Sequence, residues 1–270
     1  MSGRLRFTIL GCGSSGGVPR ADGVWGRCDP AEAKNRRSRC SMLVQKTADQ
    51  PDGPETTVLI DTSPDLRYQT SAAEVRRLDA VLYTHDHADQ AHGIDDLRVF
   101  FLTSRKRTPC YMDPATTETL MRRFDYIFET RSGYPAICDP RVLPPHHRPW
   151  SIEGPSGAIP ILNFDQDHGS IRSVGYRIGP VGYCSDVVAL PPSAMAALAG
   201  VEVFIVDALR DTPHPTHANV AMALAWIAEL KPARGVLTNL HSDLDYNELS
   251  GRLPPGVEPA YDGMVIETDA

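Results

Sequence analysis

Short apolar runs recur along the chain and predict β-strands, while apolar residues at helical spacing predict helices between them. The runs that predict strands cover residues 5–10, 40–44, 57–61, 80–83, 159–164, 171–178, 181–184, 201–207, 235–238 and 257–267. Helices are predicted over residues 64–78, 116–130 and 216–230, the last from the spacing of Val220, Leu224 and Ile227. The connection over residues 135–149 is rich in proline and is predicted to be a loop.

The order of these elements repeats in two halves. Each half consists of strands, then a helix, a strand and a second helix. This repeat indicates two packed sheets with helices on the outside. The chain has 270 residues, of which 41% are hydrophobic, and it can bury the core of one large domain. We therefore expect an α/β fold, a four-layer αββα sandwich, with residues 1–270 in a single domain.

Charge and cysteine usage narrow the classes of function. The formal net charge is −7, so no overall positive field attracts nucleic acid or an anionic membrane. No apolar run reaches the length of a membrane span and the N-terminus has no signal pattern, so a cytoplasmic protein is expected. The six cysteines form no C-x-x-C pair, which favours free thiols in a reducing compartment over a disulfide framework.

The clearest chemical signal follows the predicted strand at 80–83. His85, His87 and Asp89 occupy alternate positions there, and alternate side chains at a strand end share one face. Imidazole and carboxylate groups are ligands that zinc, manganese and iron accept. A single histidine at a strand end is more often an ordinary polar residue, and the group could be a solvated turn. The gathering of several such residues, including His92, behind one buried strand favours a metal site.

Further candidate ligands lie beyond the carboxyl ends of other predicted strands. His168 follows strand 159–164, Asp186 follows strand 181–184, and His241 follows strand 235–238. Each of them, taken alone, could be an ordinary loop residue. Together with the first group they predict a cluster of His and Asp side chains, which would be costly to bury without a cation.

A glycine-rich segment at residues 11–16 matches the G-x-G-x-x-G pattern of dinucleotide-binding proteins. In those proteins a helix opens at the third glycine, and its N-terminus binds the pyrophosphate. Here Gly17, Val18 and Pro19 follow instead, and no helix is predicted. We therefore interpret the segment as a loop that bends close to a functional site.

The pattern His-x-His-x-Asp after an apolar strand resembles the metal-binding motif of the metallo-β-lactamase superfamily. His168, Asp186 and His241 occur in the order of the other ligand motifs of that superfamily. Within it, the chain resembles most the branch of phosphoribosyl 1,2-cyclic phosphate phosphodiesterases. The segments that carry this resemblance are 11–19, 25–26, 39–41, 185–186, His217 and 262–264.

The resemblance implies a site with two divalent metal ions, zinc or manganese, with iron as an alternative. The implied ligands of the first ion are His85, His87 and His168, those of the second are Asp89 and His241, and Asp186 bridges the two. The implied catalytic residues are Asp89 and His217, of which His217 acts on the leaving group. The expected reaction is hydrolysis of a cyclic phosphate or a small nucleotide-like phosphodiester through a metal-bound hydroxide.

Two positions depart from the family pattern. Gln90 and Asn239 stand where related proteins have histidines of the second metal site, and His92 and His241 each lie two residues further on. An amide oxygen is a weaker zinc ligand than imidazole. We expect the second site to be kept with repositioned ligands, namely Asp89, Asp186 and His241, with His92 as a further ligand, and to bind its ion more weakly than the first.

Other functions on the same scaffold stay open. The chain could hydrolyse a carboxylic ester, thioester or lactam, or it could be a nucleotide-binding metalloprotein with weak catalysis. Processing of tRNA ends would need a basic surface, which a net charge of −7 does not suggest, so neither nucleic acid nor a membrane is an expected partner. The expected partner is a small phosphorylated substrate, and a homodimer is compatible with the sequence.

Overall fold

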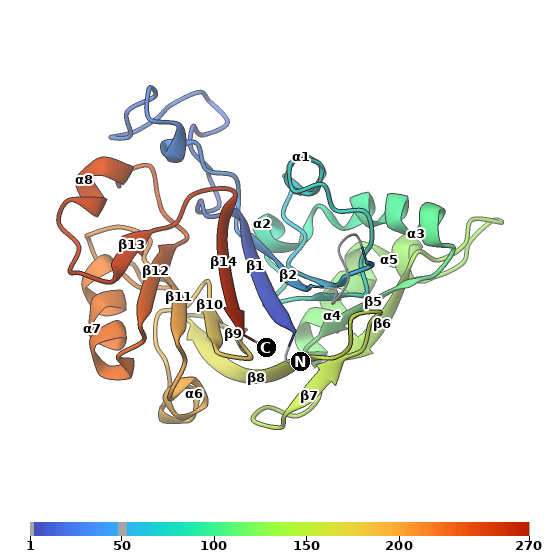
Figure 1. Ribbon diagram of the computed structural model, residues 1–270. Helices are drawn as coiled ribbons and strands as arrows, with labels where there is room; N and C mark the ends of the chain where they lie inside the picture. The colour runs from blue at the N-terminus through green and yellow to red at the C-terminus, as the bar shows by residue number, and fades with distance from the viewer. Residues whose placement is uncertain (1–2, 48–52, 270) are drawn as a thin grey trace.

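Two seven-stranded sheets form the centre of the fold (Figure 1). The computed structural model describes residues 3–47 and 53–269. The first sheet has the strand order β14-β1-β2-β3-β4-β5-β6, and the second has the order β13-β12-β11-β10-β9-β8-β7. The strands are β1 (Arg4–Gly11), β2 (Ser41–Lys46), β3 (Thr56–Ile60), β4 (Ala80–Leu82), β5 (Thr108–Met112), β6 (Cys138–Val142), β7 (Trp150–Ile152), β8 (Ile159–His168), β9 (Ile171–Ile178), β10 (Val181–Cys184), β11 (Val203–Asp207), β12 (Arg234–Thr238), β13 (Val257–Pro259) and β14 (Met264–Asp269).

Helices cover the outer face of each sheet, which makes four layers (Figure 1). Those on the first sheet are α1 (Leu66–Ala72), α2 (Ala88–Ala91), α3 (Arg98–Ser104), α4 (Pro114–Arg123) and α5 (Asp125–Phe128), and those on the second are α6 (Pro192–Leu198), α7 (Val220–Leu230) and α8 (Tyr246–Ser250). Two short 3₁₀ helices are η1 (Ala33–Asn35) and η2 (Ile94–Leu97). The predicted α/β four-layer sandwich is confirmed. Within the described ranges, no helix combines the length and apolar character that crossing a bilayer requires.

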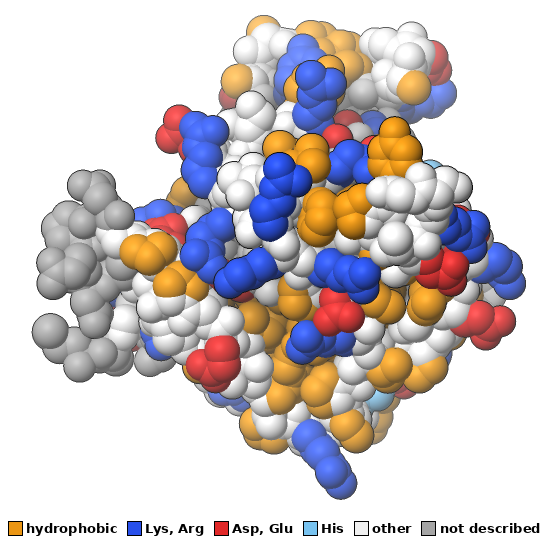
Figure 2. Space-filling view, turned by 90° about the vertical axis from the view of Figure 1, so that its right-hand side faces the viewer, with side chains coloured by type: hydrophobic (Ala, Val, Ile, Leu, Met, Phe, Trp, Pro, Cys, Tyr) orange, Lys and Arg blue, Asp and Glu red, His pale blue; other side chains and the backbone are white. Residues whose placement is uncertain are grey.

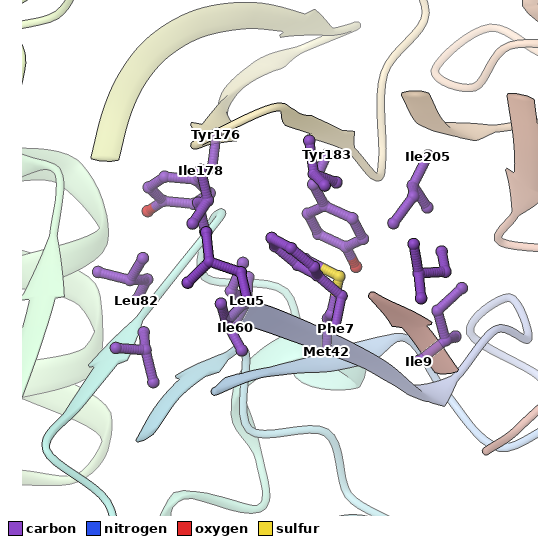
Figure 3. Close-up of a cluster of buried hydrophobic side chains, with 14 of the residues drawn as sticks. Leu5, Phe7, Ile9, Met42, Ile60, Leu82, Tyr176, Ile178, Tyr183 and Ile205 are labelled. Atoms are coloured by element: carbon purple, nitrogen blue, oxygen red, sulfur yellow. The ribbon is translucent and has the colours of Figure 1, made fainter. Parts of the chain in front are cut away.

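The inner faces of the two sheets bury a continuous hydrophobic core (Figure 3). Phe7 and Met42 of the first sheet point toward Tyr183 of the second, and all three side chains are almost inaccessible to solvent. Full burial of a large apolar side chain stabilises a fold by about 1.5–3 kcal/mol. This core fixes the two sheets against each other, so residues at their strand ends are held on a rigid frame.

The parallel parts of the two sheets place a set of polar residues at one edge. Strands β3 to β6 pair in parallel, and so do β10 to β13. The carboxyl ends of parallel strands lie at the same edge of a sheet, which is where ligands bind in open α/β folds. The residues at or just after these ends are Asp61 (β3), His85 (β4), Asp186 (β10), Asp207 (β11) and Asn239 (β12).

Several predicted elements differ from the observed ones. The predicted helix 64–78 ends at Ala72, and the predicted helix 116–130 is divided into α4 and α5 at Phe124, which leaves helical geometry at φ −130°. The predicted helix 216–230 begins only at Val220, because the Asn219 side chain caps it by accepting a hydrogen bond from the backbone of Met222.

Two differences concern strands. The proline-rich connection predicted as a loop contains β6, whose Pro140 pairs with Cys110 in the parallel ladder. The predicted last strand 257–267 forms β13 and β14, which belong to different sheets. The chain passes from one sheet to the other through a turn in which Gly263 has a φ of 86°, a conformation that favours glycine.

Candidate metal centre

Three imidazole rings meet at the carboxyl edge of the sheets. His85 and His87 follow β4, and His168 ends β8. The ring centroid of His85 lies 4.5 Å from that of His87 and 5.0 Å from that of His168, and the other two centroids are 5.1 Å apart. One ligand atom from each ring lies within 4.8 Å of the others. His85 and His168 are buried and His87 is exposed, so the group is open to solvent on one side.

A chain of hydrogen bonds fixes the orientation of His85. The Thr84 hydroxyl donates to Asp61 at 2.8 Å, so its oxygen accepts from Nδ1 of His85, 3.0 Å away. This leaves Nε2 of His85 with its lone pair free, and that atom is buried with no hydrogen-bond partner among the described residues. Burial and the neighbouring imidazoles hold the pKa of His85 well below its usual value, so the ring is neutral. A neutral imidazole with a buried, unpaired lone pair is suited to bind a cation.

His168 is held in the same way. Its Nδ1 donates to the backbone carbonyl of Thr216 at 2.7 Å, which leaves Nε2 as the ligand atom. That Nε2 lies 3.3 Å from Nδ1 of His87 and 3.9 Å from Oδ1 of Asp186. The three imidazoles and one carboxylate are a donor set that zinc, manganese and iron accept. The residues therefore fit a divalent ion at this position.

Three non-glycine residues in the left-handed region of backbone geometry surround the centre. Asp61, Asp186 and Asn239 have φ angles of 61°, 51° and 59°. Asp61 and Asn239 directly follow β3 and β12, and Asp186 lies two residues after β10. Asp and Asn tolerate this conformation better than other residues, but it still costs about 1 kcal/mol. In this conformation Asp61 accepts from Thr84, Asp186 lies near His168 and His217, and Asn239 lies near His217.

His217, which precedes α7, lies on the other side of Asp186. Its Nδ1 is 2.8 Å from Oδ2 of the fully buried Asp207 and 3.9 Å from Oδ1 of Asp186. Burial alone would lower the pKa of His217, but the hydrogen bond to Asp207 and the charges of Asp207 and Asp186 outweigh it and raise the pKa to about 9. His217, His168 and Asp186 form a second group of possible ligand atoms within 4.8 Å.

Asp89 and Gln90 lie in α2, next to Asp186. Asp89 is partly buried, and burial together with the charge of Asp186 raises its pKa. Nε2 of the fully buried Gln90 donates to Oδ2 of Asp186 at 3.0 Å. The amide at position 90 thus hydrogen-bonds the carboxylate that was expected to bridge two metal ions.

Two of the expected ligands lie outside these groups. His92 ends α2 with an exposed side chain, and its ring packs edge-on against Phe124 with 5.4 Å between centroids. His241 pairs with Asp243 at 3.1 Å. In the loop after β12, Nδ1 of His241 accepts a hydrogen bond from the backbone N–H of Asp243 at 3.2 Å. Neither His92 nor His241 belongs to a group of possible ligand atoms among the described residues.

A hollow of about 560 Å³ opens beside Asp89. Its lining residues are Ser15, Gly16, Arg20, Ala21, Asp22, Arg39, Pro64, Ala88 and Asp89. Arg39 pairs with Asp65 at 3.0 Å and Arg20 with Asp22 at 2.7 Å, and each guanidinium has five N–H donors, so both retain donors for a ligand. A larger hollow of about 1000 Å³ lies against α1 and Asp262, and none of the candidate ligands lines it.

The glycine-rich loop is close to this centre. Gly13 pairs with Arg39 and with Leu240, which follows β12. The position agrees with the interpretation of a loop that bends toward a functional site. No helix begins at its third glycine, in agreement with the argument against a dinucleotide site.

Sequence reasoning assigned no role to Asp61, Thr84 or Asp207. Asp61 and Asp207 are the last residues of two predicted strands. A carboxylate at the end of an apolar run was the sequence feature that could have indicated a role at the site. Their function depends on contacts with Thr84 and His217, and those contacts cross between segments far apart in the chain.

Comparison with known proteins identifies the family. Residues 56–239 match the model of the beta-lactamase superfamily domain, which is more than half of the chain. The chain belongs to the beta-lactamase superfamily. Proteins with this fold are hydrolases that bind divalent metal ions, and the His and Asp groups of this superfamily member agree with that assignment.

Solved structures refine the placement within the superfamily. The crystal structure of a diphosphatase from the PhnP family is 31% identical, covers 100% of this chain and 99% of its own, and gives a TM-score of 0.84. The superfamily member described here therefore belongs with the PhnP family, and the resemblance to the phosphodiesterase branch is confirmed. Zn²⁺-bound PqqB from Methylobacterium extorquens is 17% identical, covers 97% of this chain and 99% of its own, and has a TM-score of 0.73, a likeness of fold alone.

One similar protein is named as a transferase rather than as a hydrolase. An octanoyltransferase of Porphyromonas gingivalis is 28% identical over 268 residues, which is 96% of this chain but 51% of that protein. This superfamily member thus spans about half the length of the curated relative that it matches. The name describes the longer protein as a whole.

Proposed function

We propose that the chain is a metal-dependent hydrolase of a phosphodiester bond, in a cyclic phosphate or a small nucleotide-like molecule. The observation that carries the proposal is the arrangement of His217 beside the three imidazoles, 4.8 Å from the ring centroid of His168 and hydrogen-bonded to Asp207. A group of possible metal ligands and an imidazole that can carry a proton thus lie next to each other. The similarity to a diphosphatase of the PhnP family supports chemistry at phosphorus and adds diphosphates as candidate substrates.

His85, His87, His168 and Asp186 would hold a divalent ion, zinc or manganese, with iron as an alternative. When bound, such an ion polarises a phosphoryl oxygen and lowers the pKa of a water molecule. The support for this set is the tautomer of His85 and of His168, each fixed by a hydrogen bond on Nδ1. Both rings then present Nε2 to the same place.

The protein's own residues would bind the phosphate and move the proton. Arg20 and Arg39 line the hollow and can donate to the non-bridging oxygens of a phosphate. Asp89, which lines the hollow, can accept a proton from the attacking water. As the water oxygen bonds to phosphorus, the bond to the leaving oxygen breaks, and His217 gives that oxygen its proton while Asp207 stabilises the imidazolium.

The formal net charge of −7 gives little support to a nucleic acid as substrate. On the face that carries α3, Lys and Arg side chains are scattered among hydrophobic and acidic ones and form no continuous stripe (Figure 2). We propose instead a small phosphorylated substrate, and a chain that acts as a single domain in the cytoplasm. A homodimer stays a prediction.

One observation favours a second candidate function. The curated relative from Porphyromonas gingivalis is an octanoyltransferase, and the match includes almost the whole of this chain. Hydrolysis of an octanoyl ester or thioester by the same centre is therefore the alternative. The two candidates differ at the hollow, because an acyl chain needs an apolar lining whereas Arg20 and Arg39 favour an anion.

A substrate panel distinguishes these candidates. The protein loaded with zinc or manganese is assayed with bis-p-nitrophenyl phosphate, nucleoside cyclic phosphates, diphosphate esters and an octanoyl thioester. We expect metal-dependent turnover of a phosphate substrate, and Arg39→Ala should raise its KM at least tenfold. Arg141→Ala, which removes an exposed arginine on β6 that pairs with Asp139, is the matched control and should leave KM unchanged. Faster turnover of the thioester, with no effect of Arg39→Ala, would replace the proposal with the second candidate.

A further inference from the structure

The residues next to Asp186 do not fit the second metal ion that the family resemblance implies. We infer that the chain holds a single metal ion, because the side-chain amides of Gln90 and Asn239 occupy the positions where a second ion would need imidazoles. The inference rests on the first metal site of the proposed function and concerns the number of ions that the site takes.

Gln90 uses the part of Asp186 that a second ion would need. Oδ1 of Asp186 faces His168 and His217, each at 3.9 Å, whereas Oδ2 accepts the hydrogen bond from Nε2 of Gln90 at 3.0 Å. An amide N–H group is a donor and cannot bind a cation. Asp186 is thus arranged to bind one ion through Oδ1, with Oδ2 satisfied by the protein.

Asn239 lies against the His217–Asp207 pair, in which Nδ1 of His217 donates its proton to Asp207. Nδ2 of Asn239 lies 3.2 Å from Nδ1 of His217, and its Oδ1 accepts a weak hydrogen bond from the Cys40 thiol at 3.9 Å. Its left-handed backbone, at φ 59°, holds the side chain in that position. The amide at position 239 therefore supports the His217–Asp207 pair and presents no oxygen to Asp89.

The remaining donors are too few for a second zinc-type site. Neither His92, which packs on Phe124, nor His241 belongs to a group of possible ligand atoms among the described residues. His217 does belong to one, but its Nδ1 is bonded to Asp207 and its partners there are ligands of the first ion. Asp89 remains, together with Oε1 of Gln90, which is buried with no hydrogen-bond partner among the described residues. One carboxylate and one neutral amide oxygen form a much weaker site than the three imidazoles and carboxylate beside them.

The test counts ions rather than turnover. The apo-protein is titrated with zinc and, separately, with manganese, and bound metal is measured after gel filtration. We expect one equivalent in the wild type and two in the double variant Gln90→His/Asn239→His, which restores both imidazoles. Gln90→Met, which has a similar shape and no amide, is the matched control and should keep one equivalent.

Electron paramagnetic resonance of the manganese-loaded wild type supplies a second measurement that needs no variant. An isolated Mn²⁺ signal at saturation is the expected result, and a spin-coupled pair would overturn the inference. Two equivalents in the wild type would also overturn it, as would a folded double variant that still binds one. A wild type that binds no metal would instead contradict the proposed function.

Discussion

The imidazole of His217 lies 2.8 Å from the carboxylate of Asp207, which is completely buried at the end of β11. A buried carboxylate normally resists ionisation, and the His217 ring supplies the positive partner that compensates for it. The same pair holds the proton that a leaving group would need. His217 therefore connects the packing of the second sheet to the chemistry proposed for the site.

Removal of the His217 imidazole should slow hydrolysis in a way that depends on the leaving group. With His217→Ala, a substrate that releases a poor leaving group such as an alkoxide should lose about 10²–10⁴-fold in kcat. A p-nitrophenolate leaving group needs no proton and should lose much less. Steady-state kinetics on a series of phosphodiesters measures this difference. His214→Ala is the control, since His214 stacks 5.0 Å from His217 without touching Asp207, and equal losses across the series would contradict a role in proton transfer.

The pH dependence of turnover should reflect the same pair. As proton donor, His217 must be protonated, and its pKa of about 9 keeps it so at neutral pH. A bound cation beside Asp186 lowers that pKa, so kcat/KM should fall as the pH rises, at or below 9. Asp207→Asn removes the stabilising charge and should move the fall to lower pH. A pH profile of kcat/KM for both proteins checks this, and an unchanged profile in the variant would contradict it.

The hydrogen bonds behind His85 should affect metal affinity. Thr84→Val keeps the shape of the side chain but removes the hydroxyl that joins His85 to Asp61. Loss of such a contact typically lowers metal affinity 10–100-fold. Competition with a zinc chelator measures the dissociation constant. Thr70→Val is the matched control, because the Thr70 hydroxyl bonds only within and around α1, and an affinity loss equal in both variants would refute the assignment.

A buried carboxylate that is not among the candidate metal ligands should make stability depend on pH. Burial raises the pKa of Asp262 to about 6, despite hydrogen bonds from Ser38 and from the backbone of Cys12. The folded state therefore binds a proton more tightly than the unfolded chain. Its contribution to stability is complete below the unfolded pKa near 3.8 and is lost as the pH rises through 6.

Between pH 7.5 and pH 5, the free energy of unfolding of the wild type should thus rise by about 1 kcal/mol relative to Asp262→Asn, which does not titrate. Urea unfolding of both proteins at several pH values measures the difference. A constant difference would show that the Asp262 carboxylate has the same pKa in both states.

The sequence predicted the features that local patterns encode. The apolar runs located most strands, and the alternation of His85, His87 and Asp89 located the metal motif. The division of residues 257–267 between two sheets was not predictable, because an apolar run does not say which sheet it joins. The strand at 138–142 was missed because Pro140 and the prolines of the surrounding segment are typical of a loop, although the ladder of β5 and β6 accommodates Pro140.

The least predictable part of the site was the second group of ligands. Spacing alone left His92 and His241 as ligands, since both lie two residues beyond an expected position. The short α2 helix, which turns His92 toward Phe124, and the contact between His241 and Asp243 both depend on tertiary packing. The support given by Asp61 to Thr84 likewise crosses between β3 and the segment after β4 and leaves no pattern in the sequence.

The metal content and the phosphodiesterase activity of His87→Ala, measured on the same preparation, test the account most directly. His87 is exposed, so its truncation leaves no buried cavity, and the variant should fold as the wild type does. His92→Ala is the control, because His92 is also exposed and lies five residues after His87. This variant should keep both metal and activity. We predict that His87→Ala loses bound metal and hydrolysis together. Full metal occupancy with wild-type turnover in His87→Ala would contradict the metal centre proposed here.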